Sequence, residues 1–313
     1  MVTGPGFRHV YGPVPSRRLG RSLGIDLVPY KTCTYDCVYC QLGRTTNKTV
    51  ERKEYVAIDE TTAELVQRLS DIDVPDYITL SGSGEPTLNS GIGDLVRCIK
   101  QTTDIPVAVL TNGSLLWMRG LQDELMAADL VIPSLDAGDE NLFRYANRPH
   151  SSIPFGQMVD GVAEFTKRFK GQLWLEVFLL GGVTGIPVEV EKIAAAVRRI
   201  APARVQLNTV SRPPAEDFAF PVDQDQLEQF RQFFSGAVDV VGGGRASTYR
   251  GKRFKTAADE TILALLRRRP CTIRDVSAGL RINASKATKR LHVLNEQGLV
   301  RSVQEGGLVF YQA

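Results

Sequence analysis

The sequence is short of the side chains that usually build metal centres and disulfide frameworks, with 5 cysteines and 3 histidines in 313 residues. Because histidine is so scarce, we do not expect a histidine-based metal site. The number of cysteines is odd and three of them are clustered, which argues against the paired disulfides of a secreted protein. We therefore expect a reducing, cytoplasmic location.

Other missing features each exclude a class of protein. The N-terminus lacks the basic and then apolar segments of a signal peptide, and no apolar run approaches the roughly 20 residues of a membrane-spanning helix. The sequence has no P-loop, no HExxH and no GxSxG motif, which excludes the sites built on those motifs. We expect no membrane partner, and the composition, 43% hydrophobic and 23% charged, is typical of a globular protein.

Cys33, Cys37 and Cys40 carry most of the functional information, because three thiols fall within eight positions. Thiolates are soft ligands that suit iron–sulfur clusters, zinc or copper(I). A [4Fe–4S] cluster normally takes four cysteines, so three would leave one iron free to bind a small ligand. The alternatives are a structural zinc site or three buried thiols. Zinc usually has four ligands, and His9 is 24 residues upstream of Cys33, so the spacing favours a cluster.

Apolar residues alternate between strand and helix spacing over most of the chain. The pattern predicts six strands, at 23–28, 77–80, 107–110, 130–132, 173–180 and 205–207, and six helices, at 61–69, 92–99, 116–127, 158–169, 188–200 and 226–234. Such units imply parallel strands with right-handed crossovers. Since eight units close a barrel, six indicate an α/β fold with a partial (βα)6 TIM-type barrel. We expect this domain over residues 1–250, with an N-terminal arm at 1–21 and an extension at 235–256 that contains a hinge or strand pair and a linker.

The pattern changes in residues 257–313. Helices expected at 259–266, 272–280 and 283–297, with strands at 299–303 and 308–311, predict a winged helix-turn-helix domain. Residues 252–313 hold 12 Lys and Arg against 5 Asp and Glu, a net charge of +7, so the preceding residues carry −4 of the overall +3. A basic segment suits a nucleic acid as partner, although a solvated surface or a protein-interaction module would have the same composition.

Polar residues and glycines follow the expected strands, at the end where α/β barrels bind their ligands. The segment Ser83-Gly84-Glu85 follows the second strand, and its glycine would let the backbone approach a ligand closely. Asn112 follows the third strand, and Ser134 and Asp136 follow the fourth. Each could be a simple turn or a helix cap, but several aligned on one side of a barrel favour a ligand site.

The cysteine spacing, with Tyr39 just before the last cysteine, matches the signature CxxxCx(aromatic)C, and the chain resembles the radical S-adenosylmethionine (radical SAM) superfamily. The resemblance implies that Cys33, Cys37 and Cys40 hold a [4Fe–4S] cluster whose open iron binds the amino and carboxylate groups of S-adenosylmethionine (SAM). An electron would split SAM into methionine and a 5′-deoxyadenosyl radical, which abstracts hydrogen from a substrate. A low-potential electron donor of the flavodoxin or ferredoxin type is also implied.

The resemblance also implies contacts to SAM. Ser83-Gly84-Glu85 takes the place of the family's Gly-Gly-Glu segment, with serine for the first glycine, and would hold the methionine amine mainly through its backbone. Side chains after the third and fourth strands would bind the ribose and carboxylate, namely Asn112, Ser134 and Asp136. Three residues would lie near the adenine: Tyr39, Leu180 and Asn208.

The stretches 12–20, 81–88, 134–138 and 207–214 are similar to the wyosine-synthase-like group of the superfamily, which acts on tRNA. Those tRNA enzymes carry a second cluster on three cysteines upstream of the first, whereas this chain has no cysteine before Cys33. Three hypotheses follow: a radical SAM enzyme that modifies RNA, a radical SAM enzyme that acts on a protein or small molecule, and an iron–sulfur DNA-binding regulator without catalysis.

Overall fold

A computed structural model describes residues 9–241, 259–280 and 282–313. Its centre is an eight-stranded sheet in the order β1-β2-β5-β6-β7-β8-β9-β10. Strand β1 is antiparallel to β2, and all the other neighbours are parallel. The bounds are β1 (Val10–Ser16), β2 (Gly20–Ile25), β5 (Tyr77–Leu80), β6 (Val107–Thr111), β7 (Leu130–Pro133), β8 (Gln172–Leu179), β9 (Arg204–Thr209) and β10 (Val238–Val240). The chain is thus an α/β protein with a mixed, mainly parallel sheet.

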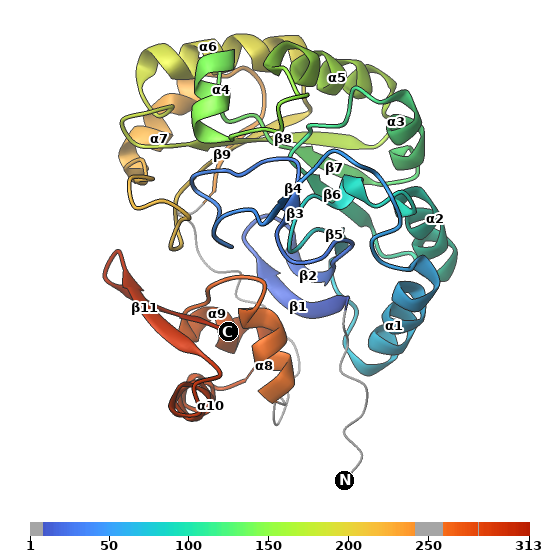
Figure 1. Cartoon of the computed structure of the whole chain (residues 1–313), viewed down its shortest axis with the longest axis vertical. Helices are drawn as coiled ribbons and strands as arrows, with labels where there is room; N and C mark the ends of the chain where they lie inside the picture. The colour runs from blue at the N-terminus through green and yellow to red at the C-terminus, as the bar shows by residue number, and fades with distance from the viewer. Residues whose placement is uncertain (1–8, 242–258, 281) are drawn as a thin grey trace.

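Helices connect the parallel strands and cover the outer face of the sheet (Figure 1). In α2, the buried residues Ile92, Leu95, Val96 and Ile99 recur at helical spacing and pack into the main apolar core. None of the helices in the described ranges is both long and apolar enough to cross a membrane. The bounds are α1 (Ile58–Asp71), η1 (Pro86–Leu88), α2 (Ile92–Thr102), α3 (Arg119–Leu125), α4 (Glu140–Ala146), α5 (Phe155–Arg168), α6 (Pro187–Ile200), α7 (Gln224–Phe230) and η2 (Arg231–Phe233).

The two faces of the sheet bury different groups of side chains. In β6, Val107 and Val109 join the main core beneath the helices, whereas Ala108 packs with Leu130 and Ile132 of β7 in a smaller core. Successive side chains of a strand point to opposite faces. The small core therefore lies on the inner face of the sheet.

Three elements of the structure differ from the sequence prediction. The expected N-terminal arm contains the strand β1, which the sequence did not predict because Pro13 and Pro15 are typical of loops. Proline is tolerated in β1 because it is an edge strand. The expected extension contributes the short strand β10 at the other edge. Helix α4 was not predicted, and Asp139 caps it by accepting a hydrogen bond from Leu142 N at 3.0 Å. The expected linker at 242–256 lies outside the described residues.

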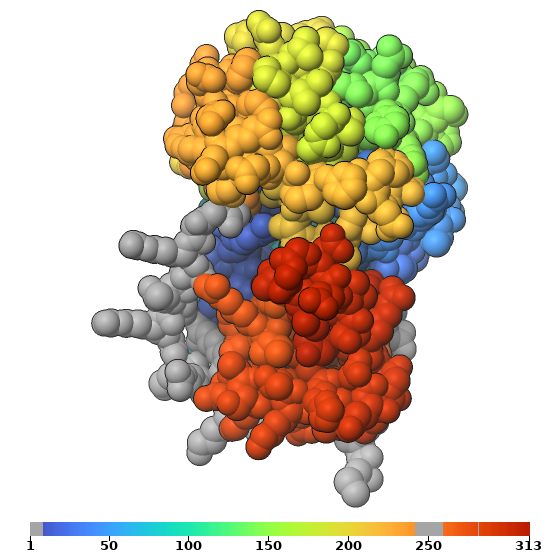
Figure 2. Space-filling view, turned by 90° about the vertical axis from the view of Figure 1, so that its left-hand side faces the viewer, coloured from blue at the N-terminus to red at the C-terminus, as the bar shows by residue number. Residues whose placement is uncertain are grey.

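The C-terminal part consists of α8 (Asp259–Leu266), α9 (Ile273–Leu280), α10 (Ala284–Glu296) and the antiparallel pair β11 (Arg301–Glu305) and β12 (Leu308–Gln312). As expected, Asn283 caps α10, accepting from Ser285 N at 2.8 Å. These elements share an apolar core that includes Val14 of β1. They lie directly against the rest of the chain (Figure 2), so the sheet edge and the C-terminal part are packed together.

Candidate cluster and cofactor site

The three clustered cysteines lie on the loop between β2 and α1, residues 26–57, beyond the carboxyl end of β2 (Figure 1). Within this loop, β3 (Thr32–Cys33) pairs in parallel with β4 (Asn47–Lys48). Cys40 N donates to Cys37 O at 3.1 Å, and Glu85 N donates to Thr32 O at 3.1 Å. The loop is therefore held to itself and to the segment that follows β5.

Each of the three thiols has a nitrogen donor within reach. Lys31 Nζ donates to Cys40 Sγ at 3.1 Å. Asn112 Nδ2 donates to Cys33 Sγ and Asn147 Nδ2 to Cys37 Sγ, each at 3.6 Å. These donors come from the loop, the end of β6 and the end of α4. N–H groups directed at sulfur stabilise thiolate ligands and tune a cluster's reduction potential, so the donor set fits an iron–sulfur cluster.

Burial makes two of the thiols, Cys33 and Cys37, weaker acids than a free cysteine. Burial, followed by the nearby Glu85 carboxylate, raises the pKa of Cys33 to about 12. Burial likewise raises the pKa of Cys37 well above its usual value, with Cys33 and Asp136 adding to the effect. Such thiols stay protonated at neutral pH unless a metal centre takes the place of the proton.

In the parts of the chain that the structure describes, no group of three or more His, Cys, Asp or Glu side chains is placed to hold a single metal ion. A cubane cluster attaches each thiolate to a different iron, so its ligands need not converge as the ligands of a single zinc ion must.

The segment Ser83-Gly84-Glu85 packs closely against the cysteine loop. A Cβ atom on Gly84 would lie 1.9 Å from Thr32 O, so only glycine fits there. Ser83 N and Oγ donate to the Asp26 carboxylate at 2.8 and 2.5 Å, and Ser83 O accepts from Lys31 N at 2.7 Å. The backbone of this segment is fixed beside the thiols.

The Glu85 side chain joins the ends of two strands. Its Oε1 accepts from Thr87 N at 3.1 Å and from the hydroxyls of Thr87 and Thr111 at 2.6 Å each, and its Oε2 accepts from Asn112 N at 2.7 Å. Burial raises the pKa of this carboxyl, and the four hydrogen bonds it accepts act in the opposite direction. Glu85 therefore connects the end of β5 with the end of β6.

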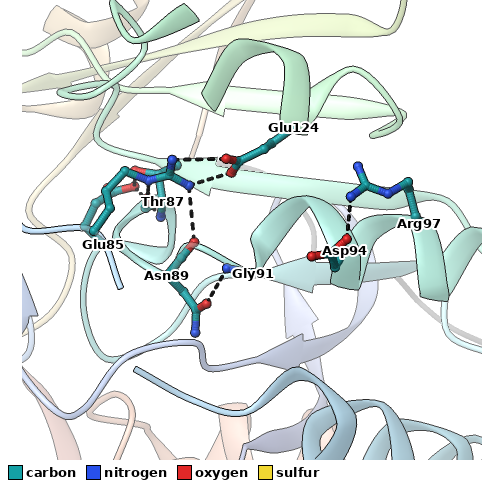
Figure 3. Close-up of polar contacts among 8 residues, drawn as sticks. Glu85, Thr87, Asn89, Gly91, Asp94, Arg97 and Glu124 are labelled. Atoms are coloured by element: carbon teal, nitrogen blue, oxygen red, sulfur yellow. Dashed lines mark hydrogen bonds and ion pairs between the residues drawn. The ribbon is translucent and has the colours of Figure 1, made fainter. Parts of the chain in front are cut away.

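Further polar contacts fix the chain that follows Glu85 and Thr87 (Figure 3). Asn89 Nδ2 donates to Leu27 O and Val56 O at 3.0 Å each, and Asn89 Oδ1 accepts from Gly91 N at 2.8 Å. From the cysteine loop, Arg52 donates to Thr87 O at 2.8 Å and pairs with Glu124 of α3 at 2.5 Å. Both ends of the loop are thereby attached to Asn89, and Arg52 also attaches the loop to α3.

Asp136 lies beneath the cysteine loop and both its oxygens have partners. Oδ2 accepts from the Tyr39 hydroxyl and from Asn147 Nδ2, the latter at 2.7 Å, and Oδ1 accepts from Phe178 N at 3.1 Å. The Tyr39 ring stacks on Phe178 with centroids 4.0 Å apart. Burial raises the pKa of Asp136 to about 6. In this arrangement Asp136 holds Tyr39 and Asn147, which in turn contacts Cys37.

The remaining expected residues lie along β7, β8 and β9. Asn208 Nδ2 donates to Glu176 Oε1 at 2.8 Å, and Glu176 also pairs with Arg18 at 3.0 Å. Ser134 forms a parallel bridge with Glu176. Leu180 is buried, and its N–H donates to the Thr184 hydroxyl at 2.9 Å. Asn208 is thus occupied by a carboxylate that the sequence analysis did not single out.

Sequence reasoning missed two of the three sulfur contacts. Lys31 is buried two positions before Cys33, and a cation so close to three thiols was an available signal. Asn147 follows α4, a helix that was not predicted, so no pattern pointed to it. The third donor, Asn112, is a residue that the sequence predicts to contact SAM. Its amide nitrogen donates to Cys33 Sγ, and its Oδ1 accepts from Ser114 N at 3.0 Å, as in a simple turn.

Residues 27–197 match the model of the radical SAM superfamily. This chain belongs to the radical SAM superfamily. Proteins of this superfamily use a [4Fe–4S] cluster together with SAM, and the three thiols fit that cofactor in their number and in their nitrogen donors. The matched range begins at Leu27 and includes the cysteine loop and the segments after β5, β6 and β7.

Nearly the whole chain is similar to each of two proteins from other organisms. It is 32% identical over 311 residues to UPF0026 protein MJ1312 of Methanocaldococcus jannaschii, covering 96% of this chain and 94% of the relative. It is 39% identical over 306 residues to a Brachyspira hyodysenteriae protein named GTPase Obg, covering 97% of this chain. The chain spans only 45% of that protein's length.

Solved structures show a similar fold. A radical SAM methyltransferase from Sphaerobacter thermophilus aligns with a TM-score of 0.57 at 18% identity, covering 70% of this chain and 65% of that one. At this identity the likeness shows the fold alone.

Proposed function

We propose that this protein is an enzyme in which Cys33, Cys37 and Cys40 hold a [4Fe–4S] cluster and SAM binds beside them. The observation that carries the proposal is the set of three thiols, each with its own nitrogen donor, packed against the segment at Gly84. When bound, the cluster would supply the electron that splits SAM into methionine and a 5′-deoxyadenosyl radical. That radical would abstract hydrogen from the substrate.

The protein residues would bind and orient SAM. The backbone of Ser83-Gly84-Glu85 would hold the methionine amine, chiefly at Gly84, since Ser83 N, Ser83 O and Glu85 N already have partners. The Glu85 side chain is likewise used to join two strand ends. We propose Ser134, Asn112 and Asp136 as SAM contacts, with Asn112 and Asp136 serving chiefly to hold the cysteine loop through Thr34 and Tyr39. The apolar group around Leu180 and Tyr39 would receive the adenine, with Asn208 at its edge.

Two architectural statements are also proposals. The open strand order, with β1 and β10 at the edges, supports a partial barrel over residues 1–250. Three helices followed by a two-stranded antiparallel sheet support a winged helix-turn-helix over 257–313. Because Val14 of β1 belongs to the core of this second part, we propose two domains with a shared interface.

The substrate class is open to two proposals, RNA or else a protein or small molecule. The similarity to the wyosine-synthase-like group and the basic C-terminal part favour RNA. However, Arg290 on α10 pairs with Asp259 at 3.3 Å and His292 lies 3.2 Å from Glu296, which reduces the positive charge that the helix can offer to phosphates. A DNA-binding regulator would need sequence-specific DNA binding and no SAM cleavage.

The test is SAM cleavage by protein loaded with iron and sulfide under anaerobic conditions, with a chemical reductant or a flavodoxin- or ferredoxin-type donor. We expect 5′-deoxyadenosine and methionine from the unsubstituted protein. Cys33→Ala, Cys37→Ala and Cys40→Ala should each abolish the products, whereas Cys98→Ala, on α2 outside the loop, should retain them. Turnover in any of the three loop variants would refute the proposed ligand set.

A further inference from the structure

Three arginines meet where the C-terminal part contacts the sheet. Arg17 lies in the turn between β1 and β2, Arg212 in the loop after β9, and Arg269 in the turn between α8 and α9. These three segments are far apart in the sequence, and hydrogen bonds between them bring them together where the C-terminal part packs on the sheet.

Each of these arginines donates a hydrogen bond to a residue that lies within two positions of another arginine of the set. Arg17 Nη2 donates to the Ser211 hydroxyl at 2.9 Å. Arg212 Nε donates to Pro270 O at 3.0 Å, and Arg269 Nη2 donates to Pro15 O at 3.4 Å. The three contacts form a ring, so the guanidinium groups occupy one small region.

None of these three arginines has an ion-pair partner of its own. Among the described residues, Arg17, Arg212 and Arg269 take part in no ion pair, and Arg269 Nε is buried without a hydrogen-bond partner. Two carboxylates are nearby: Asp275, which accepts from Thr272 N and Oγ1 at 3.0 Å each, and Glu176, which pairs with Arg18 at 3.0 Å. Burial, followed by the Arg269 and Arg17 charges, lowers the pKa of Arg212 to about 10. The guanidinium groups outnumber the nearby carboxylates, and a bound anion would reduce the repulsion among them.

A pocket of about 460 Å³ opens beside this ring, lined by Arg17, Thr209, Ser211 and Asp223 among others. Arg17 is exposed to solvent at the edge of this pocket. On the other side, Arg212 Nη1 donates to Gln41 Oε1 at 3.3 Å, and Gln41 directly follows Cys40. The arginines thus connect a pocket that small molecules can enter with the loop that carries the thiols.

We propose that Arg17, Arg212 and Arg269 bind a phosphate group of the substrate, with the pocket receiving the adjoining part of the molecule. The inference rests on the proposed function, because it names the class of molecule that reaches the thiol-bearing loop. A planar carboxylate is matched by one forked guanidinium, whereas a tetrahedral phosphate offers acceptors in several directions and can use three. The site therefore selects a phosphate ester over a carboxylic acid.

The experiment measures binding of inorganic phosphate to cluster-loaded protein by isothermal titration calorimetry at constant ionic strength. Arg17→Gln and Arg212→Gln should each weaken binding about tenfold, the loss of one charge-assisted contact. Arg267→Gln is the matched control, because Arg267 neighbours the site in sequence but pairs at the surface with Glu260; its affinity should not change. Acetate should bind none of the proteins measurably. Thermal unfolding without phosphate checks that each variant is folded. If Arg212→Gln does not fold, the affinity of Arg17→Gln alone tests the proposal, because Arg17 lies on a surface turn.

Two further ligands separate the possible sources of the phosphate. A nucleoside monophosphate carries a monoester, and a short single-stranded RNA without terminal phosphates carries only diesters. Binding of either one, weakened by Arg17→Gln but not by Arg267→Gln, supports the proposal and identifies the source. Equal affinity of all variants, or no binding of any phosphate, overturns it. SAM cleavage by the unsubstituted protein is measured separately, so a failed phosphate site with intact 5′-deoxyadenosine formation refutes this inference and leaves the proposed function standing.

Discussion

Arg268 Nε lies 3.2 Å from Asp26 Oδ2, an ion pair whose two side chains are 11% and 8% exposed. The guanidinium also sits 4.5 Å from the centre of the Tyr11 ring. Asp26 in turn accepts from Ser83 N and Oγ. One buried carboxylate therefore links the C-terminal part to the segment that we propose to hold the methionine amine of SAM.

Replacing Arg268 should destabilise the whole protein. Arg268→Met leaves the Asp26 carboxylate buried with only the two Ser83 hydrogen bonds, and we expect a loss of about 3 kcal/mol in the free energy of unfolding. Arg267→Met removes an exposed pair with Glu260 and should cost less than about 1 kcal/mol. Urea unfolding of both variants is the measurement. Equal effects would mean that the buried pair does not join the two parts.

Gly84→Ala should disrupt the site through its backbone. The added Cβ would lie 1.9 Å from Thr32 O, and a backbone oxygen cannot move away without shifting the cysteine loop. We expect a loss of at least about 3 kcal/mol in stability together with weaker SAM binding. Gly120→Ala, in α3 with open space around it, should instead be neutral or stabilising by about 0.5–1 kcal/mol. A stable Gly84→Ala protein with unchanged SAM affinity would contradict the close packing described here.

Asn147→Ala should lower the reduction potential of the bound cluster. Asn147 Nδ2 donates to Cys37 Sγ, and donors to sulfur favour the more negative, reduced state. A potentiometric titration followed by paramagnetic resonance would measure the shift, with iron content expected to stay constant. Asn141→Ala, an exposed position at the start of α4, is the control and should leave the potential unchanged. A potential that is equal in all three proteins would exclude a role for this hydrogen bond.

Glu216 should contribute stability that disappears in acid. The hydrogen bond from Arg148, at 2.5 Å, and that from Arg44 hold the pKa of Glu216 below its usual value, and Glu216 N donates to Val38 O at 3.0 Å in the cysteine loop. A carboxyl whose folded-state pKa is depressed stabilises the protein above its unfolded pKa of about 4.3, and that contribution is lost as the pH falls through the folded value.

The matching variant is Glu216→Gln. Its melting temperature should lie below that of the unsubstituted protein at pH 7, and the two should approach each other as the pH falls below about 4.3. Glu164→Gln, whose partner Arg119 is exposed, provides the control. A difference that stays constant with pH would show that the ionised carboxylate is not what stabilises the protein.

Much of the fold could be predicted because apolar spacing is a local property. The expected strands at 77–80 and 130–132 match β5 and β7 almost residue for residue, and the expected helix at 259–266 matches α8. Strand β1 could not be predicted, since its prolines suggest a loop and only its place at the sheet edge makes them compatible with a strand. Helix α4 is too short, at seven residues, to give a periodic signal.

The candidate site also has a part that the sequence predicts and a part that it does not. Cys33, Cys37 and Cys40 are close in sequence, so their spacing alone pointed to a soft-ligand metal centre. The family resemblance, together with their place after strands, predicts Asp136 and Glu85 as SAM contacts. In the structure, their oxygens accept hydrogen bonds from Tyr39, Asn147, Phe178, Thr87, Thr111 and Asn112. Those partners come from several segments, and no sequence pattern records them.

The amino-acid sequence by itself determined the cysteine spacing, the strand–helix alternation and the basic C-terminal part, because each of these lies within a few neighbouring residues. Only the tertiary structure decided which nitrogen faces each sulfur, that Asp26 joins Arg268 to Ser83, and that Arg17, Arg212 and Arg269 share one region. The physical reason is that these contacts join residues far apart along the chain. Such contacts form only when burial of apolar surface brings distant segments together.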